Sequence, residues 1–277
     1  MNALRIVSLA ATVHVAGCSS AQPPSSTAQP PSRPRIVAHR GASHDFPENT
    51  LSAFRHAWKL GVECVELDVH VTRDGEVVVI HDATTKRTAG LDRPVAEQTL
   101  AEIKTLDAGS WKGPAFAGER IPTIAEAIAT IPSGRTMFIE IKSNEQTAPA
   151  VANAIRRANP RANGAEIALQ GFEPKALAAF AAELPWAKAY WTVDPPLDAQ
   201  DRPLPYPRSV VADAVRHGFP GLALLYLSVT DELLADARAA GLLVDVWTLN
   251  EAPELAAWYA RDIRWIETDR PELAPAR

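Results

Sequence analysis

Residues 66–81 read Glu-Leu-Asp-Val-His-Val-Thr-Arg-Asp-Gly-Glu-Val-Val-Val-Ile-His, and the rest of the chain is organised around them. Side chains alternate between the two faces of a strand, so Glu66 and Asp68 point the same way and can share one cation. Oxygen ligands suit a hard ion such as Ca²⁺ or Mg²⁺. Residues 72–75 form a turn, and 76–80 form a returning strand that brings His81 back near the acids.

A pair of acids on a strand can also be simply solvated, and the neighbouring residues decide between the two interpretations. The opposite face of the strand is filled by apolar side chains at positions 65, 67, 69 and 71. The strand is therefore buried on at least one side. Because burying unpaired carboxylates is costly, we expect a cation or a basic partner beside Glu66 and Asp68.

The composition is that of an ordinary globular protein, with 277 residues, of which 47% are hydrophobic and 22% charged. A single α/β barrel or two smaller domains would fit this length. Without the single Arg of the first 18 residues, 27 basic side chains face 33 acidic ones, which gives a charge of −6. A mildly acidic protein of this kind has no electrostatic reason to bind nucleic acid.

The N-terminus predicts export and lipidation. Residues 1–17 form a signal peptide, in which Arg5 precedes an apolar run too short to span a bilayer. Val15-Ala16-Gly17-Cys18 resembles the bacterial lipobox, which implies cleavage before Cys18 and a diacylglyceryl group on its sulfur. Otherwise Cys18 is an ordinary residue of a cleaved signal. Residues 18–34, rich in Ser, Pro, Gln and Ala, then form a tether. We therefore expect a lipid-anchored protein of the bacterial cell envelope, facing the periplasm or the exterior.

The globular domain begins at residue 35, and its first strand ends in His39-Arg40-Gly41. A histidine can move a proton, a guanidinium can grip phosphate oxygens, and a glycine lets the backbone come close. A chance His-Arg at a strand end is the alternative. Next, Pro47-Glu48-Asn49-Thr50 opens a helix, with Asn49 or Thr50 as its N-cap and Glu48 as a partner for Arg40.

Strand and helix patterns alternate along the remaining chain, which is typical of a parallel α/β sheet or barrel. Apolar runs predict eight strands, at 36–39, 62–69, 136–141, 165–170, 187–192, 222–226, 243–248 and 263–267.

Several motifs together resemble the glycerophosphodiester phosphodiesterase family. They are His-Arg-Gly at 39–41, Pro-Glu-Asn-Thr at 47–50, Glu-Leu-Asp-Val at 66–69, Thr-Arg-Asp-Gly at 72–75, His-Asp at 81–82, Leu-Asp-Ala-Gly-Ser-Trp at 106–111, Gly-Glu-Arg-Ile-Pro-Thr at 118–123, Ile-Glu-Ile-Lys at 139–142 and Thr-Asp-Arg-Pro at 268–271. The resemblance implies a TIM (β/α)8 barrel over residues 35–277, with a small insertion, about 70–122, after the second barrel strand.

In a barrel, active sites lie at the carboxyl ends of the strands. Six candidate residues fall late in their strands: His39, Asp68, Glu140, Gln170, Trp247 and Glu267. Glu140 would complete a three-carboxylate set with Glu66 and Asp68, and Lys142 shares its face.

The family resemblance implies hydrolysis of glycerophosphodiesters to glycerol 3-phosphate and an alcohol, with one divalent cation, Ca²⁺ or Mg²⁺, as cofactor. By the same resemblance the metal ligands are Glu66, Asp68 and Glu140, the acid/base pair is His39 and His81, and the phosphate is held by Arg40 and Lys142.

Two further residues are candidates for substrate binding. Gln170 stands where the family pattern reads Gln-Ser-Phe, but this chain has glycine at 171 and lacks that hydroxyl. Trp247 either stacks on the glycerol or its substituent, or is a core residue.

Two other functions stay open. A phospholipase D-like or lysophospholipid-cleaving barrel enzyme would need an apolar surface near the pocket, for which Trp111 and Phe116 are candidates. A lipid-anchored binding protein with a dead site would lack a histidine or an acid, and none is missing. The sequence gives no indication of the oligomeric state.

Overall fold

The computed structural model describes residues 33–158 and 166–274. Its strands form one nine-stranded sheet in the order β1-β9-β8-β7-β6-β5-β4-β2-β3. Parallel pairing of β1 with β2 closes eight of them into a barrel, and β3 lies antiparallel to β2. The strands are β1 (Arg35–Ala38), β2 (Cys64–Val71), β3 (Val77–Val79), β4 (Thr136–Ile141), β5 (Glu166–Gly171), β6 (Lys188–Val193), β7 (Gly221–Leu225), β8 (Leu243–Trp247) and β9 (Trp265–Thr268).

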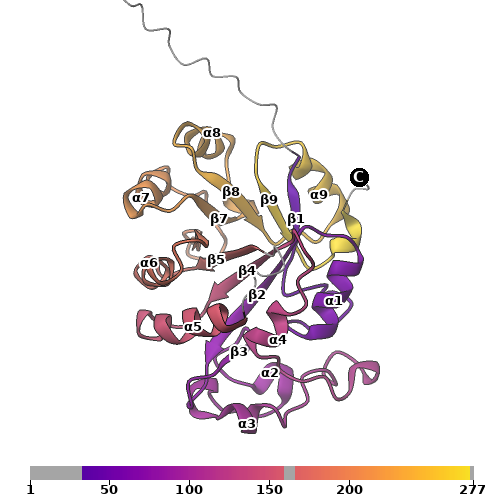
Figure 1. The fold of residues 1–277 in the computed structure, drawn as a ribbon. Helices are drawn as coiled ribbons and strands as arrows, with labels where there is room; N and C mark the ends of the chain where they lie inside the picture. The colour runs from indigo at the N-terminus through magenta and orange to yellow at the C-terminus, as the bar shows by residue number, and fades with distance from the viewer. Residues whose placement is uncertain (1–32, 159–165, 275–277) are drawn as a thin grey trace, which may run out of the picture. The chain divides into compact units, whose positions relative to one another are not determined.

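The TIM-barrel prediction is confirmed, and each barrel strand begins and ends within two residues of its predicted limits. Helices lie outside the strands, as Figure 1 shows for α5 to α8 beside β4 to β8. The helices are α1 (Leu51–Lys59), α2 (Lys86–Ala89), α3 (Leu100–Ile103), α4 (Ile124–Ile128), α5 (Ala148–Ala158), α6 (Pro174–Glu183), α7 (Ser209–His217), α8 (Asp231–Ala239) and α9 (Ala252–Tyr259).

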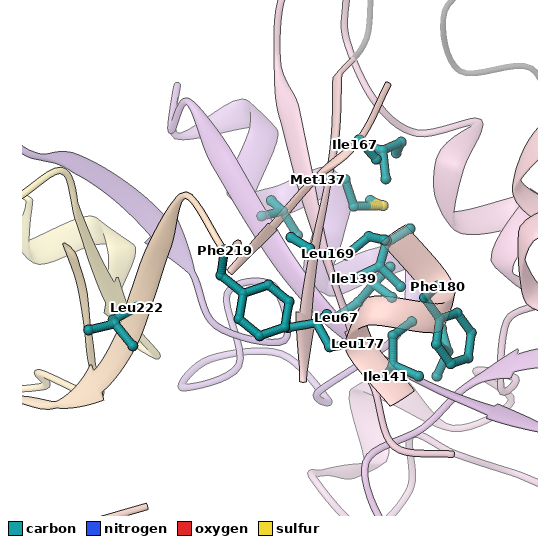
Figure 2. Packing of buried hydrophobic residues seen from close by; sticks show 14 of the residues in the cluster. Leu67, Met137, Ile139, Ile141, Ile167, Leu169, Leu177, Phe180, Phe219 and Leu222 are labelled. Atoms are coloured by element: carbon teal, nitrogen blue, oxygen red, sulfur yellow. The ribbon is translucent and has the colours of Figure 1, made fainter. Parts of the chain in front are cut away.

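The main hydrophobic core lies between the sheet and the helices. Side chains of one parity on each strand, such as Leu67, Ile139 and Leu169, point outward and are fully buried there. Leu177 and Phe180 of α6 pack against this layer (Figure 2). The apolar face of β2 is therefore covered by helices, which leaves the opposite parity, including Glu66 and Asp68, for the barrel interior.

A second, smaller core closes the amino-terminal end of the barrel interior. Phe138, Tyr190 and Trp265 meet there with ring centroids 4.8–5.8 Å apart. Cys64 is fully buried in the same cluster, and burial raises its pKa to about 12. Cys64 is thus a small core residue. The barrel interior is thus apolar at one end and polar at the other.

The segment between β2 and β4 carries β3, α2 and α3 and has a core of its own. Val78, Ile80 and Ile103 are buried in it. The turn that precedes β3 is held by Thr72, whose hydroxyl donates to Asp74 at 2.6 Å. This hairpin returns the chain to the barrel at His81, as the sequence predicts.

The signal peptide, Cys18 and nearly all of the tether lie outside the described residues. Among the residues that the structure does describe, none of the helices has the length and apolar character needed to cross a membrane.

Candidate active site

Three carboxylates gather at the carboxyl end of the barrel. Glu66 and Asp68 come from β2, and Glu140 is the register partner of Asp68 on β4. One oxygen from each lies within 4.8 Å of the other two, although the three residues are at most 9% exposed. Glu66 Oε1 has no hydrogen-bond partner within the described part of the chain. An all-oxygen donor set with an unpartnered buried atom fits a hard divalent cation.

The carboxylates differ in charge because their neighbours differ. Burial, followed by repulsion from Asp68, raises the pKa of Glu66 well above its usual value and also raises the pKa of Glu140. Burial opposes ionisation of Asp68 as well, but Lys142 and Arg40 outweigh it and lower the pKa of Asp68 to about 2. Arg40 and Lys142 can neutralise two of the three carboxylates. A net negative charge therefore arises only when all three acids are ionised, and a bound cation would favour that state.

Arg40 and Lys142 lie against these acids. Arg40 Nε is 3.3 Å from Asp68 Oδ2, and the Arg40 backbone N–H donates to Glu66 Oε2 at 2.9 Å. Lys142 Nζ lies 2.5 Å from Glu140 Oε1 and 3.2 Å from Asp68 Oδ1. The predicted pairing of Arg40 with Glu48 is confirmed at 3.0 Å. Both cations are thus fixed beside the acids, where they can bind an anionic group.

Asn49 is not the N-cap of α1. Thr50 has that role, accepting a hydrogen bond from Ala53 N at 3.3 Å. Asn49 has φ of 57° and turns its amide to Asp68 instead, donating to Oδ2 at 2.7 Å and accepting from the Asp68 N–H at 3.2 Å. The Pro-Glu-Asn-Thr motif therefore builds the site as well as beginning a helix.

His39 is held by a carboxylate that is not among the predicted site residues. Its Nδ1 lies 2.7 Å from Asp269 Oδ1. Ser43 donates to the same oxygen at 2.8 Å, and Asn250 donates to Oδ2 at 2.7 Å. Burial alone would lower the pKa of His39, but the hydrogen bond to Asp269 raises it overall. The hydrogen bond to Asp269 therefore favours the charged form of His39.

His81 has a carboxylate behind it too, at 2.8 Å between Nδ1 and Asp82 Oδ1. Arg87 donates hydrogen bonds to both Asp82 and Glu48. Because Glu48 also pairs with Arg40, these contacts connect the end of the hairpin to Arg40. Burial lowers the pKa of His81, in contrast to that of His39. The two histidines thus favour opposite protonation states.

A cavity of about 220 Å³ connects these groups, and both histidines, Glu140, Lys142 and Trp247 line it. Gln170 also reaches it, but its amide donates to Asp245 and Glu267, both at 2.9 Å, in a buried polar layer of the barrel. The sequence does not reveal that layer, because its members lie on three separate strands. The predicted substrate contacts of Trp247 and Gln170 stay predictions.

The carboxyl end of the barrel carries two histidines backed by carboxylates, two basic side chains and a cluster of three acids. This combination is typical of a TIM-barrel hydrolase that acts on an anionic substrate. Residues 39–273 match the model of the glycerophosphoryl diester phosphodiesterase family. The chain belongs to this family and to its enzyme class, the phosphodiester hydrolases.

Named relatives agree with this assignment. The chain is 33% identical to a glycerophosphodiester phosphodiesterase of Caldanaerobacter subterraneus subsp. tengcongensis over 86% of this chain and 94% of the relative. Among solved structures, a phosphodiesterase of Oleispira antarctica is similar, with a TM-score of 0.77 and 28% identity over 87% of this chain and 94% of that one. A glycerophosphodiester phosphodiesterase of Thermotoga maritima is similar with a TM-score of 0.68 and 27% identity, over 87% and 97%.

Proposed function

We propose that the enzyme hydrolyses glycerophosphodiesters to glycerol 3-phosphate and an alcohol, with Ca²⁺ or Mg²⁺ held by Glu66, Asp68 and Glu140. The observation that carries the proposal is one pocket lined by both carboxylate-backed histidines, by two basic side chains and by Glu140, one of the three clustered acids. The Oleispira enzyme was solved with its product sn-glycerol 3-phosphate, which supports the same substrate class. A divalent cation at the three acids would offset the negative charge of the phosphodiester.

The histidines divide the proton transfers. His39, whose pKa the hydrogen bond to Asp269 raises, donates a proton to the departing alkoxide. His81, whose pKa burial lowers, accepts the proton of the attacking oxygen in its neutral form. Arg40 and Lys142 bind the phosphate oxygens and orient the phosphorus between the two rings.

Cleavage of intact or lysophospholipids is not favoured. The named relatives are glycerophosphodiester phosphodiesterases. Of the two insertion aromatics proposed as a lipid surface, Trp111 is exposed but Phe116 packs against Phe46, with ring centroids 5.3 Å apart.

The test is release of glycerol 3-phosphate from glycerophosphocholine and glycerophosphoethanolamine by the mature chain from Cys18 onward, with and without a chelator. We expect chelator-sensitive release, restored by Ca²⁺ or Mg²⁺, and losses of about 10²-fold or more in His39→Ala, His81→Ala and Glu66→Ala. His217→Ala, an exposed histidine on α7, is the matched control. Hydrolysis of a lysophospholipid but of neither glycerophosphodiester would change the assignment to lipid cleavage. Release of glycerol 3-phosphate that a chelator does not affect would refute the proposed metal dependence.

We also propose that the protein is anchored by a lipid on Cys18 in the bacterial envelope, where it would recover glycerol 3-phosphate from headgroup debris. The support is Arg5, the apolar run after it and Val15-Ala16-Gly17-Cys18.

A further inference from the structure

Thr192, on β6, presents a buried hydroxyl to the active-site cavity. The residue is 4% exposed and lines the cavity together with Arg40 and Lys142. Its Oγ1 has no hydrogen-bond partner in residues 33–158 and 166–274. Because leaving a buried hydroxyl unpaired is unfavourable, a group of the bound substrate is expected to pair with it.

The alternation of β6 places a second polar group beside it. Tyr190 contributes to the aromatic floor, so residues of the same parity face the barrel interior. Two residues on, Thr192 lines the cavity, and two further on Asp194 lines its more exposed part. The intervening Trp191 instead donates from Nε1 to the Phe172 carbonyl at 2.9 Å. β6 and the residue that directly follows it therefore present a hydroxyl and a carboxylate in succession.

A third group completes this side of the cavity. Trp247 of β8 lines it as well, and its buried Nε1 has no hydrogen-bond partner among the residues described. Arg40, Glu140 and Lys142 approach from β1 and β4, or from the loops that follow them. The cavity thus has a charged side suited to phosphate and a side with a hydroxyl, an indole N–H and a carboxylate.

We propose that Thr192 and Asp194, together with Trp247 Nε1, form the subsite for the two neighbouring hydroxyls of the glycerol moiety. The inference rests on the proposed function and names the residues that recognise the part of the substrate common to all glycerophosphodiesters. Thr192 and Trp247 donate to hydroxyl oxygens, and the Asp194 carboxylate accepts from a hydroxyl proton. A trimethylammonium headgroup has no acceptor for these two donors, so the diol satisfies the cavity better than a cationic alcohol does.

A binding experiment isolates the subsite from catalysis. Calorimetry on the metal-loaded mature chain would compare sn-glycerol 3-phosphate with inorganic phosphate. We expect Thr192→Val to weaken binding of glycerol 3-phosphate about fivefold to tenfold and to leave phosphate unchanged, while Thr192→Ser retains the affinity. Thr136→Val, at the opposite end of the barrel, is the matched control and should change neither. Equal losses for both ligands, or none, would overturn the proposal.

A kinetic experiment separates glycerol from headgroup. Thr192→Val and Asp194→Asn should raise KM for glycerophosphocholine and glycerophosphoethanolamine alike and leave hydrolysis of propylphosphocholine, which lacks both hydroxyls, unchanged. A loss in Asp194→Asn confined to choline and ethanolamine esters, with glycerophosphoglycerol unaffected, would assign the carboxylate to a cationic headgroup and overturn the proposal. A third outcome is that the wild-type protein hydrolyses no glycerophosphodiester, while Thr192→Val still weakens the binding of glycerol 3-phosphate. That outcome would refute the proposed function and support the subsite.

Discussion

His39 owes its raised pKa to a carboxylate that is distant in the sequence. Asp269, whose hydrogen bond raises the pKa of His39, lies 230 positions away and is itself held by Ser43 and Asn250. The motif around Asp269 can be recognised in the sequence, but its pairing with His39 cannot. Pairings between the first and last strands of a barrel follow from closure, which a linear pattern does not display.

Replacing Asp269 by Asn should move the alkaline limb of the activity profile. Asp269 raises the pKa of His39, and the proton-donating form of His39 is lost as pH rises through that pKa. Without the carboxylate the pKa of His39 falls, so we expect the limb to move to lower pH. The measurement is kcat/KM against pH. Asp236→Asn, on the outer helix α8, is the control. An alkaline limb that stays in place would show that Asp269 does not set the charge of His39.

At the scale of elements, the strands were predictable because runs of β-branched and aliphatic residues with polar ends are distinctive. The alternation along β2 likewise predicts correctly that Glu66 and Asp68 share one face of the strand. The start of α1 was less predictable. Asn49 and Thr50 are both good N-cap residues, and only the fold shows that Asn49 serves Asp68 instead. Thr192 and Asp194 lie in an ordinary Trp-Thr-Val-Asp run, so no residue pattern marks them.

Asn49 should stabilise the junction of β1 and α1 through two separable effects. Asn49→Ala removes both hydrogen bonds to Asp68 and forces alanine into a left-handed conformation, for a loss of about 3 kcal/mol in the free energy of unfolding. Asn49→Gly removes the same bonds without the backbone strain, so its loss should be about 1 kcal/mol smaller. Urea denaturation of metal-free protein measures both, with exposed Asn153→Ala as control. Equal losses in the two variants would rule out the strain contribution.

Across the whole molecule, the barrel interior changes from aromatic rings at one end to ionisable groups at the other. Between them lies the buried layer of Gln170, Asp245 and Glu267. Burial raises the pKa of Asp245 to about 7, and burial together with Asp245 raises that of Glu267. This layer therefore contains two buried carboxyl groups for which ionisation is unfavourable.

Asp245 should therefore make the folded protein less stable as pH rises. Its unfolded pKa is near 3.8 and its folded pKa is about 7, so the folded state binds the extra proton between these values. This contribution is fully present below about pH 4 and is lost as pH rises to about 7, on the order of 4 kcal/mol at most. Asp245→Asn should gain stability relative to wild type over that window. Denaturation at several pH values checks the difference, and a constant difference would contradict the assignment.

Cys18, which lies outside the described residues, is the expected site of lipidation. If Cys18 carries the lipid, Cys18→Ser should abolish incorporation of labelled fatty acid and leave the protein unprocessed in its bacterial host. Cys64→Ser is the matched control, because Cys64 is fully buried in the barrel floor with a pKa raised to about 12 and is a poor nucleophile. Labelling should persist in that variant, and the mature protein should fractionate with membranes. Fatty-acid label retained in Cys18→Ser, or wild-type protein found free in the cytoplasm, would refute the anchor. The assignment of the barrel as a phosphodiesterase would stand in either case, since it rests on residues 39–273.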